Sequence, residues 1–229
     1  PTEVGRTVLA LFDIGLRRMN HVNPFNRRSP YLITIISVLL LLARNCFAET
    51  QPNVLFILCD DLRWDALGCA GNPYIKTPHI DRLAKEGVYF KNTFCTTSLC
   101  SPSRASILSG LYAHVHGVTN NFTEYPVSLP SFPRRLQEAG YETAITGKWH
   151  LGGFEAAYRP TARGFDHQYG HYFGALDYFT HIRDGQTDWY RNDQPLQESG
   201  YTTELLASEA VRLIQDRQTR GTDKPLFLY

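Results

Sequence analysis

The sequence predicts an α/β fold with a largely parallel central sheet flanked by helices. Short apolar runs alternate with helix-like segments along the chain, and no internal repeat or low-complexity segment interrupts them. The chain has 229 residues, of which 43% are hydrophobic and 13% aromatic, which is ample for a sizeable core. These observations exclude a disordered chain and predict one globular domain or part of a larger one.

The first half of the chain supplies two expected strands and two expected helices. NVLFILCDD (53–61) is a continuous apolar run, which predicts a buried strand that ends in two carboxylates. In TPHIDRLAKEG (77–87), Pro78 fits the first helical position and Gly87 fits a stop. VYFKNTF (88–94) alternates as a strand does, and a helix is expected over 103–111.

The second half continues the alternation. A short helix is expected within LPSFPRRLQEAG (129–140), followed by the strand YETAITG (141–147). TTELLASEAVRLIQDR (202–217) carries five apolar side chains on one helical face, and KPLFLY (224–229) begins another buried strand. The segment 151–200 is rich in Gly, Tyr and His, and we expect it to form loops over the strand ends.

The amino-terminal region predicts an export signal. Residues 31–43 form the only long apolar run, which is short for a membrane span but typical of a signal-peptide core. Two arginines precede it, and the small residues of CFA (46–48) suit a signal peptidase. Because the sole methionine is Met19, we expect an upstream extension at 1–18, a signal peptide at 19–48 and a periplasmic or secreted chain without a stable membrane anchor. The alternative is a buried core helix at 31–43.

The charge distribution argues against nucleic-acid binding. Six of the 23 Lys and Arg residues lie before residue 49, with only Glu3 and Asp13 to balance them. The remaining chain has 17 basic and 20 acidic residues, so it is slightly acidic. No basic surface is therefore expected.

Four cysteines follow the expected cleavage site, and an exported protein usually pairs its cysteines. Cys59, Cys69, Cys95 and Cys100 allow two disulfides in three connectivities. Cys59 falls within the apolar run of the first strand, where a free thiol packs as a small hydrophobe. A bridge between Cys69 and Cys95 stays open, and nothing requires Cys100 to pair.

Asp60 and Asp61 end the first strand, at the edge of the sheet where α/β folds collect their functional groups. A charged pair does not remain in an apolar layer without a partner. Adjacent carboxylates suit a hard cation such as Ca²⁺ or Mg²⁺, although a helix cap or a solvated turn is the commoner role of such a pair.

Four further residues could form an anion-binding site. Cys100 precedes Pro102, which places the thiol at or just before a helix N-terminus, where anions are favoured. Arg104 follows one turn later with a guanidinium that suits tetrahedral oxyanions. Lys148 and His150 end another strand, and alternation sends both to one face. Taken singly, Arg104 is more often a helix-surface ion pair, Lys148 a solvated charge and His150 a satisfied loop histidine.

Three stretches resemble the signatures of the sulfatase family. CSPSRASILSG (100–110) resembles the signature in which Cys-x-Pro-Ser-Arg marks a cysteine that is converted to formylglycine. GYETAITGKWH (140–150) resembles the second signature, and PNVLFILCDDLRWDALGCAG (52–71) is similar to the first metal-binding strand. The resemblance runs from Pro52 to Tyr229 and is strongest to the arylsulfatase branch that includes N-acetylgalactosamine-4-sulfatase. Ser109 and Thr146 are minor departures.

The resemblance implies a sulfuric ester hydrolase with an alkaline-phosphatase-like fold. Cys100 would carry formylglycine after modification by a formylglycine-generating machinery. Asp60, Asp61 and the modified Cys100 would bind Ca²⁺, with Mg²⁺ as the other possibility. Arg104, Lys148 and His150 would bind the formylglycine hydrate and the sulfate of a sulfated small molecule or glycan.

The family also has a later Asp with Asn or His at the metal, and further His and Lys residues that this sequence does not contain. Residues 49–229 are therefore expected to be the amino-terminal part of a truncated sulfatase catalytic domain, inactive alone. Two other functions stay open. One is a phosphonate or phosphate ester hydrolase of the same superfamily, and the other is a catalytically silent protein that binds sulfated glycans.

Overall fold

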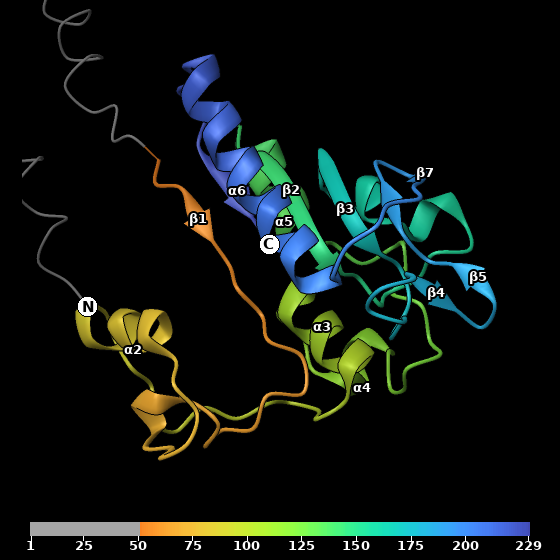
Figure 1. Cartoon of the computed structure of the whole chain (residues 1–229). Coiled ribbons are helices and arrows are strands. Elements are labelled where there is room, and N and C mark those ends of the chain that lie inside the picture. Colours follow the sequence, from red (N-terminus) through yellow and green to blue (C-terminus); the bar gives the residue numbers. More distant parts are fainter. Residues whose placement is uncertain (1–50) are drawn as a thin grey trace, which may run out of the picture. The chain divides into compact units, whose positions relative to one another are not determined.

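The structure is a computed structural model that describes residues 51–229. The expected extension at 1–18 and the expected signal peptide at 19–48 lie outside the described residues. A six-stranded mixed sheet forms the centre of the described part (Figure 1). From edge to edge its strands are β1 (Val54–Leu55), β8 (Leu226–Leu228), β2 (Glu142–Lys148), β3 (His167–His171), β6 (Tyr190–Arg191) and β7 (Gln194–Pro195).

The pairing confirms the expected largely parallel sheet. β1, β8, β2 and β3 are parallel neighbours, whereas β6 and β7 add an antiparallel edge. A separate antiparallel ribbon consists of β4 (Ile182–Arg183) and β5 (Gln186–Thr187). Because the four parallel strands all end on one side, the segments that follow them collect at one edge of the sheet.

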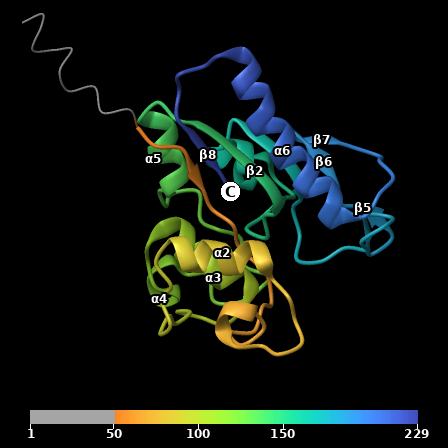
Figure 2. The same ribbon diagram turned by 60° about the vertical axis from the view of Figure 1, so that its left-hand side comes forward.

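Helices lie on both faces of the sheet. The helices are α2 (Pro78–Glu86), α3 (Cys100–Ser109), α4 (Ala113–His116), α5 (Phe132–Glu138) and α6 (Thr202–Arg220), with short 3₁₀ turns at Gly68–Ala70, Ala156–Tyr158 and Pro160–Arg163. Figure 2 shows α5 and α6 on opposite sides of β2 and β8. The described residues contain no helix that is both long and apolar enough to cross a membrane.

The period-2 alternation of the strands divides the core between these two faces. Ile145 and Phe227 face a large cluster that includes Ala105 of α3 and Leu136 of α5. Ala144, which precedes Ile145 in β2, faces the other side, where α6 covers a smaller cluster. The apolar face expected for 202–217 therefore packs on the sheet through Ala210 and Leu213.

Two sequence-based expectations in the first part of the chain are wrong. The first strand is only two residues long, and Cys59 is exposed rather than packed within it. Among residues 51–229, β1 is an edge strand that pairs with β8 alone. The apolar run around it, which the sequence predicts to be buried on both faces, is therefore left largely exposed. Residues 88–94 form no strand, because their backbone meets no strand partner.

The cysteine question is settled for the described residues, where all four thiols are free. Cys59 and Cys95 are exposed, and Cys69 and Cys100 are half-buried. The proposed bridge between Cys69 and Cys95 is therefore absent.

A buried carboxylate ties α6 to the sheet. The Glu209 side chain is only 4% exposed, and its Oε1 lies 2.7 Å from a nitrogen of Arg191 and 2.8 Å from Nε2 of His167. Arg212, one turn later on α6, adds two more hydrogen bonds. Burial acts to raise the pKa of Glu209, but the hydrogen bonds and charges of Arg212 and Arg191 outweigh it and hold the pKa at about 2.

We expect Glu209→Gln to lower the free energy of unfolding at pH 7 by about 2 kcal/mol, because Arg191 and Arg212 lose their anionic partner. The loss stays this small because both arginines are partly exposed, and water solvates them once the charge of Glu209 is gone. Because the pKa of Glu209 is lower in the folded chain than its ordinary value of 4.5, its ionised form stabilises the fold at pH values above 4.5. This contribution is lost as the pH falls toward 2 and the carboxylate is protonated. Urea unfolding of wild type and variant should therefore converge in acid. Glu204→Gln on the exposed face of α6 is the control, and an equal loss in both variants would contradict the prediction.

Candidate active site

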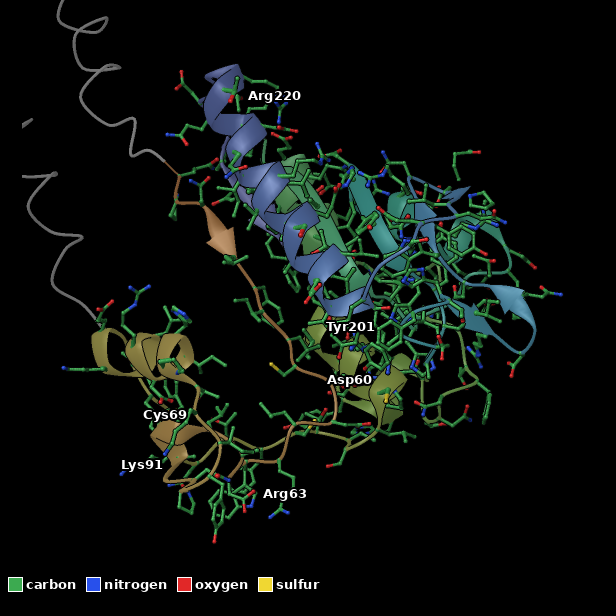
Figure 3. All side chains as sticks on the ribbon, in the orientation of Figure 1. Asp60, Arg63, Cys69, Lys91, Tyr201 and Arg220 are labelled. Carbon is green, nitrogen blue, oxygen red and sulfur yellow. The ribbon has the colours of Figure 1, made fainter. Side chains whose placement is uncertain are left out.

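The carboxyl ends of the parallel strands bring together side chains that are far apart in sequence. Asp60 follows β1, Lys148 ends β2, His171 ends β3 and Tyr229 follows β8. Lys148 and His171 are register partners on neighbouring strands. Figure 3 shows Asp60 where the chain beyond β1 reaches α3. The sheet therefore positions the site from four strands.

The two carboxylates and the cysteine form one cluster. Asp60, Asp61 and Cys100 each offer a ligand atom, and these atoms all lie within 4.8 Å of one another. Asp61 has a φ of 51°, in the left-handed region, which turns the chain sharply after Asp60. Carboxylate oxygens suit Ca²⁺ or Mg²⁺, whereas a thiol does not. The cluster fits a hard cation once residue 100 carries oxygen in place of sulfur.

Helix α3 begins at Cys100, three residues before its expected start. Pro102 is accommodated because the N–H groups of a first helical turn have no intrahelical partner. The N–H of Ser101 instead donates to Oδ1 of Asn121 at 3.0 Å, and the N–H of Ser103 donates to the carbonyl of Leu99 at 2.9 Å. The side chain of residue 100 is thereby held at a helix N-terminus that a distant asparagine caps.

One buried and one half-buried cation border the cluster. The Arg104 side chain is 5% exposed and the Lys148 side chain is 10% exposed. One Arg104 nitrogen donates to the Lys148 carbonyl at 2.7 Å, and the other lies 3.7 Å from Oδ1 of Asp60. Nζ of Lys148 donates to Oδ2 of Asp60. Helix and strand therefore hold both cations beside residue 100, as the sequence predicts.

The charge of Asp60 is maintained by these cations. Burial acts to raise the pKa of Asp60, but the hydrogen bond and charge of Lys148 and the charge of Arg104 outweigh it, with a contribution from Cys100. The pKa of Asp60 therefore lies below its ordinary value, and the group is an anion at neutral pH. Asp61 makes no salt bridge within residues 51–229.

His150 lies near these groups but not through strand alternation. β2 ends at Lys148, and His150 has a φ of 57°, which turns its side chain out of the strand pattern. Its Nδ1 is buried and has no hydrogen-bond partner among residues 51–229. Burial and then the charges of Lys148 and Arg104 lower the pKa of His150 to about 4. The imidazole is therefore neutral at pH 7.

A glycine makes room for this imidazole. A Cβ on Gly174 would lie 2.6 Å from Cε1 of His150, closer than real contacts allow. Next to it, burial lowers the pKa of His171 to about 3, and Nδ1 of His171 lies 2.9 Å from the carbonyl of Phe173. His171 is therefore neutral and donates Nδ1–H to that carbonyl.

A cavity of about 510 Å³ opens beside His150. Its wall comes from the loop after α4, the segment after β2, the end of β3 and the β4–β5 ribbon. The lining includes the side chains of Glu124, Phe154 and Arg183. The expected role of 151–200 as a cover over the strand ends is thus realised by loops and by short strands.

Sequence reasoning named six residues, and the structure brings Asp60, Asp61, Cys100, Arg104 and Lys148 into one cluster with His150 at its border. It missed several others because their signals are not local. Asn121 accepts a hydrogen bond from Ser101, 20 residues earlier on α3, and the hydroxyl of Tyr229 accepts a hydrogen bond from Arg104 at 3.4 Å. His171 could have been found, since it too ends a strand.

Residues 52–229 match the family model described as Sulfatase, and the chain belongs to the sulfatase family. It is 34% identical over 171 residues to N-acetylglucosamine-6-O-sulfatase of Bacteroides thetaiotaomicron, with coverage of 73% of this chain and 28% of that protein. It is 34% identical over 194 residues to arylsulfatase J of Mus musculus, with coverage of 79% and 32%. The chain thus spans about a third of the length of the curated relatives it matches.

The solved structures agree with the sulfatase fold. The structure of BT4656 in complex with its substrate D-glucosamine-2-N,6-O-disulfate superposes with a TM-score of 0.66 at 34% identity, over 78% of this chain and 33% of that chain. The mixed α/β architecture with a mostly parallel central sheet is therefore confirmed.

Proposed function

We propose that the protein to which this chain belongs hydrolyses sulfate monoesters of aryl groups or carbohydrates, with a formylglycine made from Cys100 as its nucleophile. One observation carries the proposal: residue 100 lies at a helix N-terminus, its ligand atom lies within 4.8 Å of those of two carboxylates, and the buried Arg104 and the half-buried Lys148 border this cluster. Transfer of a sulfuryl group requires a nucleophile, groups that bind an anion and a cluster that holds a hard cation, all at one place.

The chemistry follows from the hydrate of the aldehyde, which carries two hydroxyls on one carbon. One hydroxyl attacks sulfur, the bond between sulfur and the ester oxygen breaks, and the alcohol leaves with a proton. The second hydroxyl then loses its proton, the C=O bond re-forms and sulfate departs. A serine or threonine ester has no second hydroxyl on that carbon and could not be released in this way.

The neighbouring side chains have distinct roles in this proposal. Arg104 and Lys148 offset the negative charge that grows on the sulfate oxygens, a contribution for which loss of one donor commonly costs a factor of about 10² to 10³ in rate. His150, neutral at pH 7, orients a hydroxyl of the hydrate. Asp60 and Asp61 would hold Ca²⁺ or Mg²⁺, which as a Lewis acid supplies charge stabilisation.

The proposal extends to the setting of the protein. Sulfated small molecules or glycans are the substrates, and a formylglycine-generating machinery is the partner that modifies Cys100. Export to the periplasm or the medium fits the amino-terminal sequence. Nucleic acid is not a partner, because the chain after residue 48 is slightly acidic.

Mass spectrometry of the peptide that contains Cys100 tests the proposal. In full-length protein produced together with the modifying machinery, we expect that peptide to be about 18 Da lighter than its unmodified form. The same protein should hydrolyse 4-nitrophenyl sulfate. Two results would refute the proposal. An unmodified thiol in a protein that hydrolyses phosphonate esters would favour the ester hydrolase of the same superfamily. An unmodified thiol in a protein that binds sulfated glycans without turnover would favour the catalytically silent binding protein.

A further inference from the structure

We propose that Asn121 is a positioning residue for the hydrolysis, which restrains both the peptide group beside residue 100 and the imidazole of His150. This role rests on the proposed function. Asn121 acts in it through two other groups, so its loss should slow the covalent step and leave the binding of the sulfate largely unchanged.

Helix α3 has no cap of its own. The residue before it is Leu99, whose side chain has no polar atom, and no side-chain cap hydrogen bond forms there. The N–H groups of a first helical turn need partners from outside the helix. Oδ1 of Asn121, in the loop after α4, accepts the N–H of Ser101 at 3.0 Å. Ser101 is only 1% exposed, so water does not readily replace this acceptor.

The peptide group that Asn121 holds is the one that follows residue 100. Its N–H belongs to Ser101 and its carbonyl to Cys100, and the planar peptide bond keeps these atoms and the Cα of residue 100 in one plane. The hydrogen bond therefore restrains the orientation of this plane and of the Cβ attached to it. In the proposed reaction this Cβ is the carbon that carries both hydroxyls of the hydrate. A rotation of the plane would move the hydroxyl that attacks sulfur.

Asn121 also acts on His150. Both residues line the cavity at the border of the cluster. Burial and then the charges of two neighbouring cations lower the pKa of His150, and a hydrogen bond with the backbone of Asn121 acts against them. One residue thus restrains the carbon that carries the hydroxyls and the imidazole that orients one of them.

The loop that carries Asn121 is fastened to α3 itself. Nδ1 of the buried His116 accepts a main-chain N–H of the same loop at 3.1 Å, so Nε2 carries the proton and donates to Oγ of Ser106 on α3 at 3.0 Å. Oδ1 of Asn120 accepts the N–H of Phe122 at 2.8 Å, which closes a turn around Asn121. The main chain of Asn121 is therefore held relative to α3, within reach of its short side chain.

Steady-state kinetics of the full-length protein with 4-nitrophenyl sulfate test this role. We expect Asn121→Ala to lower kcat by about 10- to 100-fold and to change KM by less than about threefold, because the attacking hydroxyl is misplaced while Arg104 and Lys148 still bind the sulfate. Asn121→Asp keeps an acceptor at the same place and should restore kcat to within about threefold of wild type. Its added charge should raise KM, since a carboxylate repels the sulfate ester.

Asn72→Ala is the matched control. Oδ1 of Asn72 accepts the N–H groups of Tyr74 and Ile75 at 3.0 and 2.8 Å, in a loop that contributes no residue to the site. That variant should lower the melting temperature, as Asn121→Ala does, but it should keep the wild-type kcat. Mass spectrometry gives the modified fraction of residue 100 in each preparation, so that kcat refers to modified protein alone.

The outcomes separate this role from the proposed function. If wild type hydrolyses the ester and Asn121→Ala keeps its kcat, or Asn121→Asp does not restore it, the positioning role is wrong and the proposed function stands. An equal loss of kcat in Asn72→Ala would likewise overturn the role, because a general loosening of the fold would explain it. If modified wild type hydrolyses no sulfate ester, both fail. Should Asn121→Ala not fold, Asn121→Gln carries the amide one methylene further out and should lower kcat by a similar factor.

Discussion

Cys100→Ala should abolish hydrolysis of 4-nitrophenyl sulfate by the full-length protein, with turnover at least about 10⁴-fold below that of wild type. The reason is that alanine has no group that can become an aldehyde, so no covalent step remains, and the flanking charges alone do not form a new bond to sulfur. The substitution should fold, because alanine favours a helix and α3 is capped from outside by Asn121.

The measurement is steady-state kinetics together with the melting temperature of each variant. Cys95→Ala is the matched control. Cys95 is exposed, and its sulfur lies 3.1 Å from the hydroxyl of Ser103, which belongs to α3 as Cys100 does. That variant should keep wild-type turnover. Activity above a trace in Cys100→Ala, with an unchanged melting temperature, would refute the nucleophile assignment.

The parts of the fold that the sequence predicted well are those in which local pattern and burial agree. β2 and α6 were expected close to their observed bounds because apolar residues recur there at strand and helix spacing and meet partners on the sheet. The first strand and residues 88–94 differ because an apolar pattern states only that a segment can be buried, and not that a partner is present.

In the candidate site, too, some residues could be predicted from the sequence and others could not. Asp60, Lys148 and Arg104 could be found because Asp60 follows a strand, Lys148 ends one and Arg104 lies one turn into the helix that Cys100 begins, and parallel strands bring such positions together. His150 was expected on the strand face, but its left-handed backbone moves it to the cavity wall, and only the packing against Gly174 reveals this. Asn121 lies in a loop without any motif, so its role depends on a contact across the fold that no spacing encodes.

The second large effect is expected at the acidic pair, because its two members are not equivalent. Asp60 is a salt-bridge partner of Lys148 and Arg104, whereas Asp61 forms no salt bridge in the described part of the chain. Asp61→Asn therefore removes one charged oxygen from the cation cluster and leaves the cations paired. Asp60→Asn removes a ligand and also leaves the buried Arg104 and the half-buried Lys148 without their carboxylate, which is a costly arrangement.

We accordingly expect Asp61→Asn to lower kcat/KM for 4-nitrophenyl sulfate by about 10- to 100-fold, with partial recovery in millimolar Ca²⁺, since the lost charge weakens binding of a hard cation. Asp60→Asn should lose more activity, and added Ca²⁺ should not restore it, because the cation does not replace the partner of Lys148. Asp65→Asn, which alters the surface pair of Arg63 and Asp65, is the control. Calorimetric titration with Ca²⁺ should show weaker binding in Asp61→Asn and unchanged binding in Asp65→Asn. If a chelator and Asp61→Asn both leave turnover at the wild-type value, the carboxylates hold no catalytic metal, and their role is confined to pairing with Lys148 and Arg104.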